Sequence, residues 1–341
     1  MITGLFMNLI LYQSTMSLQD EFPPYGEKEI EDSQKFMIEL LAVILISTLT
    51  WAVFRFITKD IIGPVNSISF SITYILVAPI VFLGPVIYYW VKHREEEGLP
   101  VRLFAYDSPQ ATLTERAVRT FTARMVKYVL IIAVSLTVVN YLLELILDWW
   151  TLNSGMYGKT EINFSWMRDV DSIFAYFILV FANLAVVATV EEFFFRGFIQ
   201  DQFSRVVETW QSILISATLF AMTHIPIAIF IYEIEGLWLF TALINWFGFG
   251  LATGYIYHLT RNIWVVVAWH GIWNVTVSTI DYTFLIWEIP SPGLESFVWI
   301  FQTLLINGLF LLCIYFFRNY LTEFGRFENI PAQPKSIEVK L

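Results

Sequence analysis

Six polar side chains lie inside stretches of this chain that are otherwise apolar enough to cross a membrane. They form three short patterns, Glu-Glu-x-x-x-Arg, Phe-x-x-x-His and His-x-x-x-Asn, and the residues are Glu191, Glu192, Arg196, His224, His270 and Asn274. An ionisable group in hydrocarbon costs at least a few kcal/mol, so such residues are rare and mark functional sites by default. Carboxylates, imidazoles and carboxamides can activate and orient water. The patterns therefore indicate an enzyme that handles water within the membrane.

In the first pattern, only one of the two adjacent carboxylates can pair with the arginine. Glu192 and Arg196 are four residues apart, so on a helix they share a face and can pair. Glu191 is five residues from Arg196, roughly 140° around the helix, and points elsewhere. Glu191 is therefore the less committed carboxylate and the candidate general base. The alternative is an ordinary ion pair at the cytoplasmic end of a span.

The second and third patterns each supply an imidazole. Phe220 and His224 share a helix face, and Pro226 should bend or weaken the helix beside them. His270 and Asn274 also share a face, where two neutral donors could hold a developing oxyanion. The structural alternatives are a satisfied core histidine and an interhelical hydrogen-bonded pair. Together, a base, an imidazole and two oxyanion donors are what hydrolysis of a peptide bond by water requires.

Other hydrolytic chemistries have little support in the sequence. The His-Glu-x-x-His zinc signature and the Gly-x-Ser-x-Gly pattern are both absent, and the single cysteine, Cys313, lies in an apolar run. One Glu, two His and an Asn could ligate zinc. Water activation by Glu and His needs no metal, so we expect no cofactor.

The composition predicts a membrane protein. Hydrophobic residues make up 57% of the 341 residues and charged residues 15%, against about 25% charged in soluble domains. The mean hydropathy is +0.63, and the net charge of −10 argues against a nucleic-acid partner. We expect an all-α polytopic protein with about eight transmembrane helices around a polar intramembrane cavity. The predicted spans are roughly 37–57, 68–91, 126–148, 172–190, 211–232, 237–257, 262–281 and 296–317.

The distribution of basic residues predicts the orientation. Lys and Arg gather in the link between the second and third spans, which places this link in the cytoplasm. Eight spans then put both termini in the cytoplasm, with Arg55 among the few basic residues on the other side. We expect a single domain over 36–318, with its motif core at 170–280, between tails at 1–35 and 319–341. The stretch 112–125 is either an interfacial helix held by anionic lipid or an ordinary solvated helix.

In this order and on successive spans, the three patterns resemble those of the CAAX prenyl endopeptidases of the Ras-converting type. These endopeptidases belong to the CPBP (Abi) superfamily of intramembrane proteases. The resemblance covers roughly residues 170–280 and includes the run Gly250-Leu-Ala-Thr-Gly254 before Thr260-Arg-Asn-Ile-Trp. It implies that Glu191 and His224 activate the attacking water and that His270 and Asn274 form the oxyanion hole. Glu192 and Arg196 would support the site, with Arg196 also a candidate to bind a substrate carboxylate.

The resemblance also implies an activity. Such a hydrolase removes the C-terminal tripeptide from a prenylated CAAX-type protein or peptide, whose prenyl chain can enter membrane lipid beside the cavity. It would reside in the plasma membrane of a prokaryote or the endoplasmic reticulum of a eukaryote. Two alternatives stay open at this point. One is a protease of the same superfamily with a non-prenylated peptide substrate, in bacteriocin processing or immunity. The other is a non-catalytic membrane scaffold.

Overall fold

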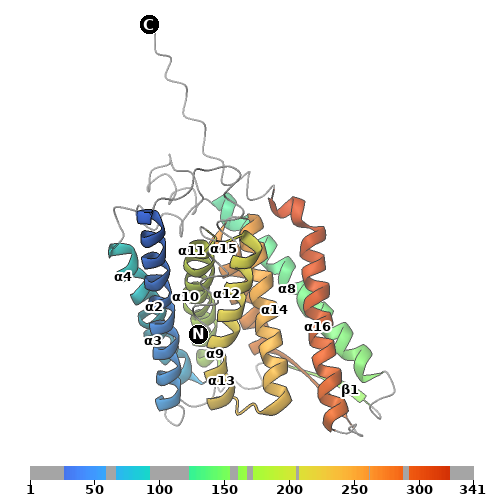
Figure 1. Cartoon of the computed structure of the whole chain (residues 1–341). Helices are drawn as coiled ribbons and strands as arrows, with labels where there is room; N and C mark the ends of the chain where they lie inside the picture. Colours follow the sequence, from blue (N-terminus) through green and yellow to red (C-terminus); the bar gives the residue numbers. More distant parts are fainter. Residues whose placement is uncertain are drawn as a thin grey trace.

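The chain folds as a bundle of long helices that run roughly parallel to one another (Figure 1). The computed structural model describes residues 27–58, 67–92, 123–153, 160–166, 172–204, 207–260, 262–286 and 292–322. The first half contains α2 (Glu27–Thr58), α3 (Ile68–Ala78), η1 (Pro79–Leu83), α4 (Gly84–Lys92), α8 (Ala123–Leu152) and β1 (Thr160–Trp166). Of the stretch 112–125, residues 112–122 lie outside the described part, and α8 begins at Ala123.

The second half of the chain carries the three polar patterns. It begins with the fourth long helical run of the described chain, which consists of α9 (Ile173–Phe181), η2 (Ala182–Val187), α10 (Ala188–Glu192), η3 (Phe193–Gln200) and α11 (Asp201–Phe203). The remaining elements are α12 (Thr209–Thr223), α13 (Ile225–Phe230), α14 (Gly236–Thr260), α15 (Ile263–Thr279), β2 (Ile280–Ile286) and α16 (Pro292–Phe316).

The structure confirms the all-α polytopic class. Within the described residues, seven helical runs are long and apolar enough to cross a membrane. They are Ile38–Thr58, Ile68–Tyr89, Val126–Leu152, Ile173–Phe203, Thr209–Phe230, Gly236–Thr260 and Glu295–Phe316. The other expected span corresponds to α15, whose 17 residues fall short of the usual ~20. Only the connection 261–262 separates α15 from α14, so the chain turns back through the bundle, and the start of α2 and the end of α16 lie at the same end (Figure 1).

The outer surface of the bundle is apolar. Large hydrophobic side chains point outward along most of the long helices, among them Leu76, Ile80, Phe177 and Phe301, each more than half exposed. Apolar patches of this extent are rare on monomeric soluble proteins. This surface fits a lipid environment, and the protein is an integral, multi-pass membrane protein.

The fourth span differs most from its prediction. It was expected to end near residue 190, where the charges begin, but the helical run continues to Phe203. All residues from Val190 to Phe203 are buried, so the charges lie inside the protein, where they have partners. Two π-helical segments, η2 and η3, flank the short α10 that carries Glu191 and Glu192. Such segments occur mostly at functional sites.

A two-stranded ribbon at one end of the bundle was not predicted. Strand β1 pairs antiparallel with β2, from Thr160 opposite Ile286 to Trp166 opposite Ile280. Because β2 follows α15 directly, the ribbon connects the helix that carries His270 to the segment after α8.

Two glycines explain the spacing in the Gly250-Leu-Ala-Thr-Gly254 run of α14. A Cβ added at Gly250 would lie 2.9 Å from the Cα of Ala217 in α12, and one at Gly254 would lie 2.9 Å from Gln200 Oε1. A side chain at either position would therefore force these elements apart. The close approach leaves the Gly254 carbonyl within 3.0 Å of Gln200 Nε2. Gly250 thus brings α14 against α12, and Gly254 brings it against the span that carries the carboxylates.

Candidate active site

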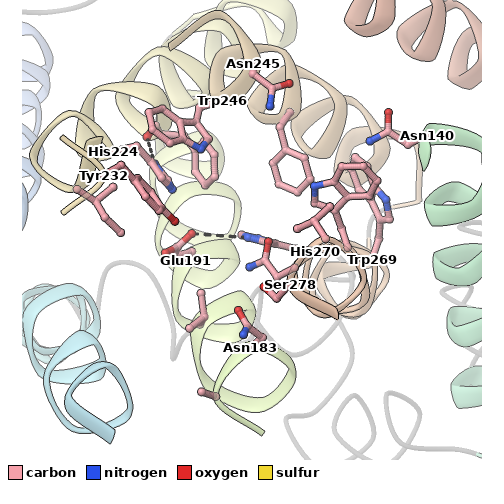
Figure 2. A pocket seen from close by; sticks show the side chains of 18 of the residues that line it. Asn140, Asn183, Glu191, His224, Tyr232, Asn245, Trp246, Trp269, His270 and Ser278 are labelled. Carbon is pink, nitrogen blue, oxygen red and sulfur yellow. Dashed lines mark hydrogen bonds and ion pairs between the residues drawn. The ribbon is translucent and has the colours of Figure 1, made fainter. Parts of the chain in front are cut away.

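The structure contains a cavity of about 430 Å³ inside the bundle. Four of the predicted site residues line it, one from the fourth run, one from the end of α12 and two from α15: Glu191, His224, His270 and Asn274. In Figure 2, Glu191, His224 and His270 face a common space. Glu192 and Arg196 are fully buried and do not line the cavity.

Glu191 lies at the cavity wall with one close polar neighbour on each oxygen. The hydroxyl of Tyr74, from α3, donates a hydrogen bond to Oε1. Oε2 lies 3.8 Å from Nε2 of His270, which is an ion-pair distance rather than a hydrogen bond. The side chain is 5% exposed. Glu191 therefore has no cation in direct contact within the described structure other than His270 in its protonated form.

Glu192 and Arg196 form the ion pair that their spacing predicts. Arg196 Nη1 donates to Glu192 Oε1 at 3.0 Å, and Arg196 Nη2 donates to the Gly250 carbonyl at 3.2 Å and to the Thr253 hydroxyl. The guanidinium carbon also lies 4.7 Å from the ring centroid of Phe220, at cation–π distance. Both terminal nitrogens are engaged and the residue is 0% exposed. A substrate carboxylate at Arg196 would therefore compete with Glu192 for the terminal nitrogens.

His270 connects the two carboxylates. Its Nδ1 lies 2.6 Å from Glu192 Oε1, the atom that also accepts from Arg196. Because this oxygen also accepts from Arg196, it accepts from the imidazole too, and Nδ1 is the donor of the hydrogen bond. A neutral ring would then present Nε2 as an acceptor, and donation from Nε2 needs the doubly protonated ring. We predicted two neutral oxyanion donors; with Nδ1 bonded to Glu192, an oxyanion role for His270 requires Nε2 to carry a proton as well.

His224 owes its orientation to a break in the helix. The backbone N–H of His224 bonds to the Ala221 carbonyl at 3.1 Å, so the Phe220 carbonyl is free to accept from the His224 ring. Nδ1 lies 2.7 Å from that carbonyl, which can only accept, so Nδ1 carries the proton and Nε2 a lone pair. Pro226 lies in the first turn of α13, as the sequence predicted. The ring packs 4.9 Å from the Trp246 ring.

Carboxamides line much of the remaining cavity. Asn274 lies one turn after His270, and no described residue hydrogen-bonds to its side chain. Asn140, Asn183 and Asn245 come from three other elements and surround the same space (Figure 2). These groups can both donate and accept, which suits a peptide backbone. Asn140, Asn183 and Asn245 were not predicted as site residues, because an isolated Asn in a span forms no motif.

Two further residues beside Glu191 were missed. Tyr74 was one of 16 tyrosines, and its role depends on a contact across 117 residues of chain. Arg55 was counted only among the basic residues on the non-cytoplasmic side, but it is 1% exposed, within the last turn of α2. The sequence did contain a signal for Arg55: it lies inside a predicted span whose only acidic residue is Glu39, and a charged residue within a span indicates a functional role.

Within the described residues, no three His, Cys, Asp or Glu side chains are grouped as metal ligands are. Glu191 approaches His270 but reaches no third ligand there, and the other carboxylate near His270 is held by Arg196. The Asn274 amide would be a weak ligand for zinc compared with His, Cys or carboxylate.

The geometry agrees with a similarity to a known family. Residues 173–276 match the family model described as Rce1-like, type II CAAX prenyl endopeptidase Rce1-like. The matched range begins with α9, ends within α15 and includes all six predicted site residues. No curated protein matches the chain. The family match supports the CPBP superfamily and, in general terms, a membrane protease.

Proposed function

We propose that the protein is an intramembrane endopeptidase that removes the C-terminal tripeptide from prenylated CAAX-type proteins or peptides. One observation carries the proposal: Glu191 faces a cavity beside two imidazoles, while its neighbour Glu192 is taken up by Arg196. This leaves one carboxylate free to take a proton from water. The similarity over residues 173–276 supports the substrate class.

In the proposed mechanism, a water molecule lies between Glu191 and His224. Glu191 takes a proton from the water, whose oxygen attacks the scissile carbonyl carbon, and the lone pair on His224 Nε2 accepts the second O–H as a hydrogen bond. The C=O π bond opens to an oxyanion, which accepts hydrogen bonds from protonated His270 Nε2 and the Asn274 amide. Glu191 then gives its proton to the leaving amine as the C–N bond breaks. Glu192 and Arg196 are positioning residues in this scheme, because they hold the His270 ring.

Tripeptide release from a synthetic peptide tests this proposal. The purified protein in liposomes is given a farnesylated CAAX peptide, and release is followed by mass spectrometry. The controls are the Glu191→Ala protein and the same peptide without the prenyl group. We expect release only with Glu191 and the prenyl group together. Release from both peptides would indicate a protease of different specificity, and no release from either would favour a non-catalytic scaffold.

We further propose that activity needs no metal. The proposed proton transfers use Glu191, with His224 as a hydrogen-bond acceptor for the water, so a zinc chelator should leave the rate of tripeptide release unchanged. Metal analysis of the purified protein provides a second readout. Stoichiometric zinc, together with activity that the chelator abolishes and zinc restores, would contradict this proposal.

We propose that the end of the bundle where α2 begins and α16 ends faces the cytoplasm. The basic residues in the link between the second and third spans favour this orientation. A tag placed after residue 341 should react with an impermeant reagent only in permeabilised cells. Labelling of intact cells would reverse the orientation. The membrane would be the plasma membrane in a prokaryote and the endoplasmic reticulum in a eukaryote.

A further inference from the structure

Arg55 is a fully buried cation without an acidic partner in the described part of the chain. It lies in the last turn of α2, within a membrane-spanning segment, and is 1% exposed. Its Nε and Nη2 atoms are buried and have no hydrogen-bond partner among the described residues. A buried charge is costly unless it is paired and hydrogen-bonded. The arrangement therefore needs a ligand to complete it.

Aromatic rings cover the guanidinium without using its donors. Its central carbon lies 4.2 Å from the Trp51 ring centroid, 4.7 Å from that of Phe70 and 5.2 Å from that of Tyr74. Cation–π contacts of this kind engage the faces of the planar group. The N–H donors lie in the plane, in the fork that matches a carboxylate. Arg55 is thus held in place by contacts that leave its donors available.

Arg55 lies directly behind the cavity wall. Phe70 and Tyr74, which both contact the guanidinium, both line the cavity, and Tyr74 donates a hydrogen bond to Glu191. One tyrosine side chain therefore contacts both Arg55, through its ring, and the proposed base, through its hydroxyl. Three residues of extended peptide span ~10 Å. This length is comparable to that of the Tyr74 side chain together with the Arg55 guanidinium and the Glu191 carboxylate that it contacts.

We infer that Arg55 binds the C-terminal α-carboxylate of the peptide substrate. This inference rests on the proposed function, because it assumes that the bond three residues from the C-terminus is cleaved at Glu191. The carboxylate reaches the guanidinium as the substrate fills the cavity and the Phe70 side chain turns aside. The charge pairing would then set where the chain is cut, because it fixes the distance between the terminus and the attacking water.

The competing arginine has both terminal nitrogens engaged and only Nε without a partner in the described structure, and it does not reach the cavity. Arg196 uses Nη1 for Glu192 and Nη2 for Gly250 and Thr253, and it does not line the cavity. A substrate carboxylate there would have to displace Glu192 from a buried pair. At Arg55 it would displace only aromatic contacts.

The inference is tested with two farnesylated CAAX peptides that differ only in a free or an amidated C-terminus. For the wild-type protein we expect amidation to lower kcat/KM by about 10- to 100-fold, as loss of a hydrogen-bonded ion pair would. In Arg55→Met, kcat/KM for the free acid should fall by a similar factor, and amidation should have no further effect. Arg55→Lys keeps the charge but not the fork, so it should retain part of the preference for the free acid.

The matched control is Arg318→Met, which removes an arginine that also packs on an aromatic ring, 3.9 Å from the Tyr315 centroid, outside the cavity. It should keep the full preference for the free acid. If Arg55→Met and Arg55→Lys lower kcat/KM for both peptides equally, Arg55 acts structurally and the inference is overturned. Wild-type cleavage that ignores amidation would overturn it too, while leaving tripeptide release intact. No cleavage of the free acid by the wild type would overturn the proposed function itself.

Discussion

Glu191 and Glu192 are adjacent in one short helix, and the two sides of that helix differ completely in how their charges are satisfied. On the side of Glu192, the carboxylate oxygen Oε1 contacts the Arg196 guanidinium at 3.0 Å and the His270 imidazole at 2.6 Å, and Arg196 also donates to a backbone carbonyl and to Thr253. On the side of Glu191, the carboxylate has a tyrosine hydroxyl and a distant imidazole, and Arg55 beyond it packs on aromatic rings. We call these the closed side and the open side.

The difference indicates that one side of the helix stabilises the fold and the other side takes part in the reaction. An ion pair that is buried away from the cavity cannot bind a substrate without losing a partner, whereas a charged group at or behind the cavity wall with no counter-ion in contact can. The closed side therefore stabilises the bundle and orients His270. The open side holds the groups that a water molecule and a peptide would contact. Variants on the two sides should consequently affect different measurements.

The largest contrast is expected between Glu191→Gln and Glu192→Gln. Glu191→Gln should lower kcat/KM for tripeptide release by about 10³-fold, because a general base contributes on that order, with little change in thermal stability. Glu192→Gln should lower the stability by ~3 kcal/mol as well as the activity, because it leaves Arg196 buried without its counter-ion. Both are measured by peptide cleavage and by the midpoint of thermal unfolding in detergent. Equal stability loss in the two variants would remove the distinction between the sides.

The two arginines should show the same contrast in stability alone. Arg196→Met leaves buried Glu192 with His270 as its remaining partner and should cost ~3–5 kcal/mol. Arg55→Met breaks no ion pair within the described structure, so its unfolding midpoint should stay near that of the wild type. Thermal unfolding of both variants in one detergent gives the comparison. A destabilisation by Arg55→Met as large as that by Arg196→Met would mean that the open side is structural too.

Gly250→Ala tests the packing behind the closed side. The added methyl group would meet the Ala217 backbone at 2.9 Å, so α14 and α12 must separate, at a cost of ~1–3 kcal/mol. Gly308 in α16 is the matched control, because a methyl group added there would have no described atom within 4 Å. Gly308→Ala should leave the unfolding midpoint unchanged or slightly higher. Similar midpoints for the two variants would show that the glycine contact does not hold the closed side together.

Tyr74→Phe should have the smallest effect. It removes the hydrogen bond to Glu191 Oε1 but keeps the ring against Arg55. We expect kcat/KM to fall about tenfold, as for loss of one hydrogen bond to a charged group, with the preference for a free C-terminus intact. Cleavage of the acid and amide peptides by this variant measures both quantities. A lost preference for the acid would mean that the Tyr74 hydroxyl, rather than Arg55, distinguishes the two termini.

The sequence predicted the fold and the core of the site because both depend on local patterns. Apolar runs of about 20 residues reveal spans without any knowledge of contacts. The Glu192–Arg196 pair follows from its spacing alone. Polar side chains are rare within spans, so we expected the three patterns to meet in one site. The cavity is indeed lined by Glu191, His224, His270 and Asn274.

The remaining features depend on contacts between distant segments. Nothing near Glu192 in sequence predicts that its oxygen also binds His270, 78 residues away, and this contact changes the proposed protonation of that ring. The burial of Arg55 was not predicted, because a basic residue near the end of a span was used only to count charges for the orientation. The fourth span was predicted too short because hydropathy penalises charges whether or not they are paired.

The π-helical segments of the fourth span have a consequence for insertions and deletions. Each such segment is usually one residue longer than the α-helical turn it replaces. Losing that residue from η2 would therefore leave the direction of Glu191 nearly unchanged, whereas deleting one residue from the regular helix α9 would rotate Glu191 by ~100° relative to the start of that helix. The membrane would tolerate the change, because bilayers accept spans that differ by a residue or more. The angular phase of this helix, which hydropathy does not record, is therefore under tighter constraint than its length.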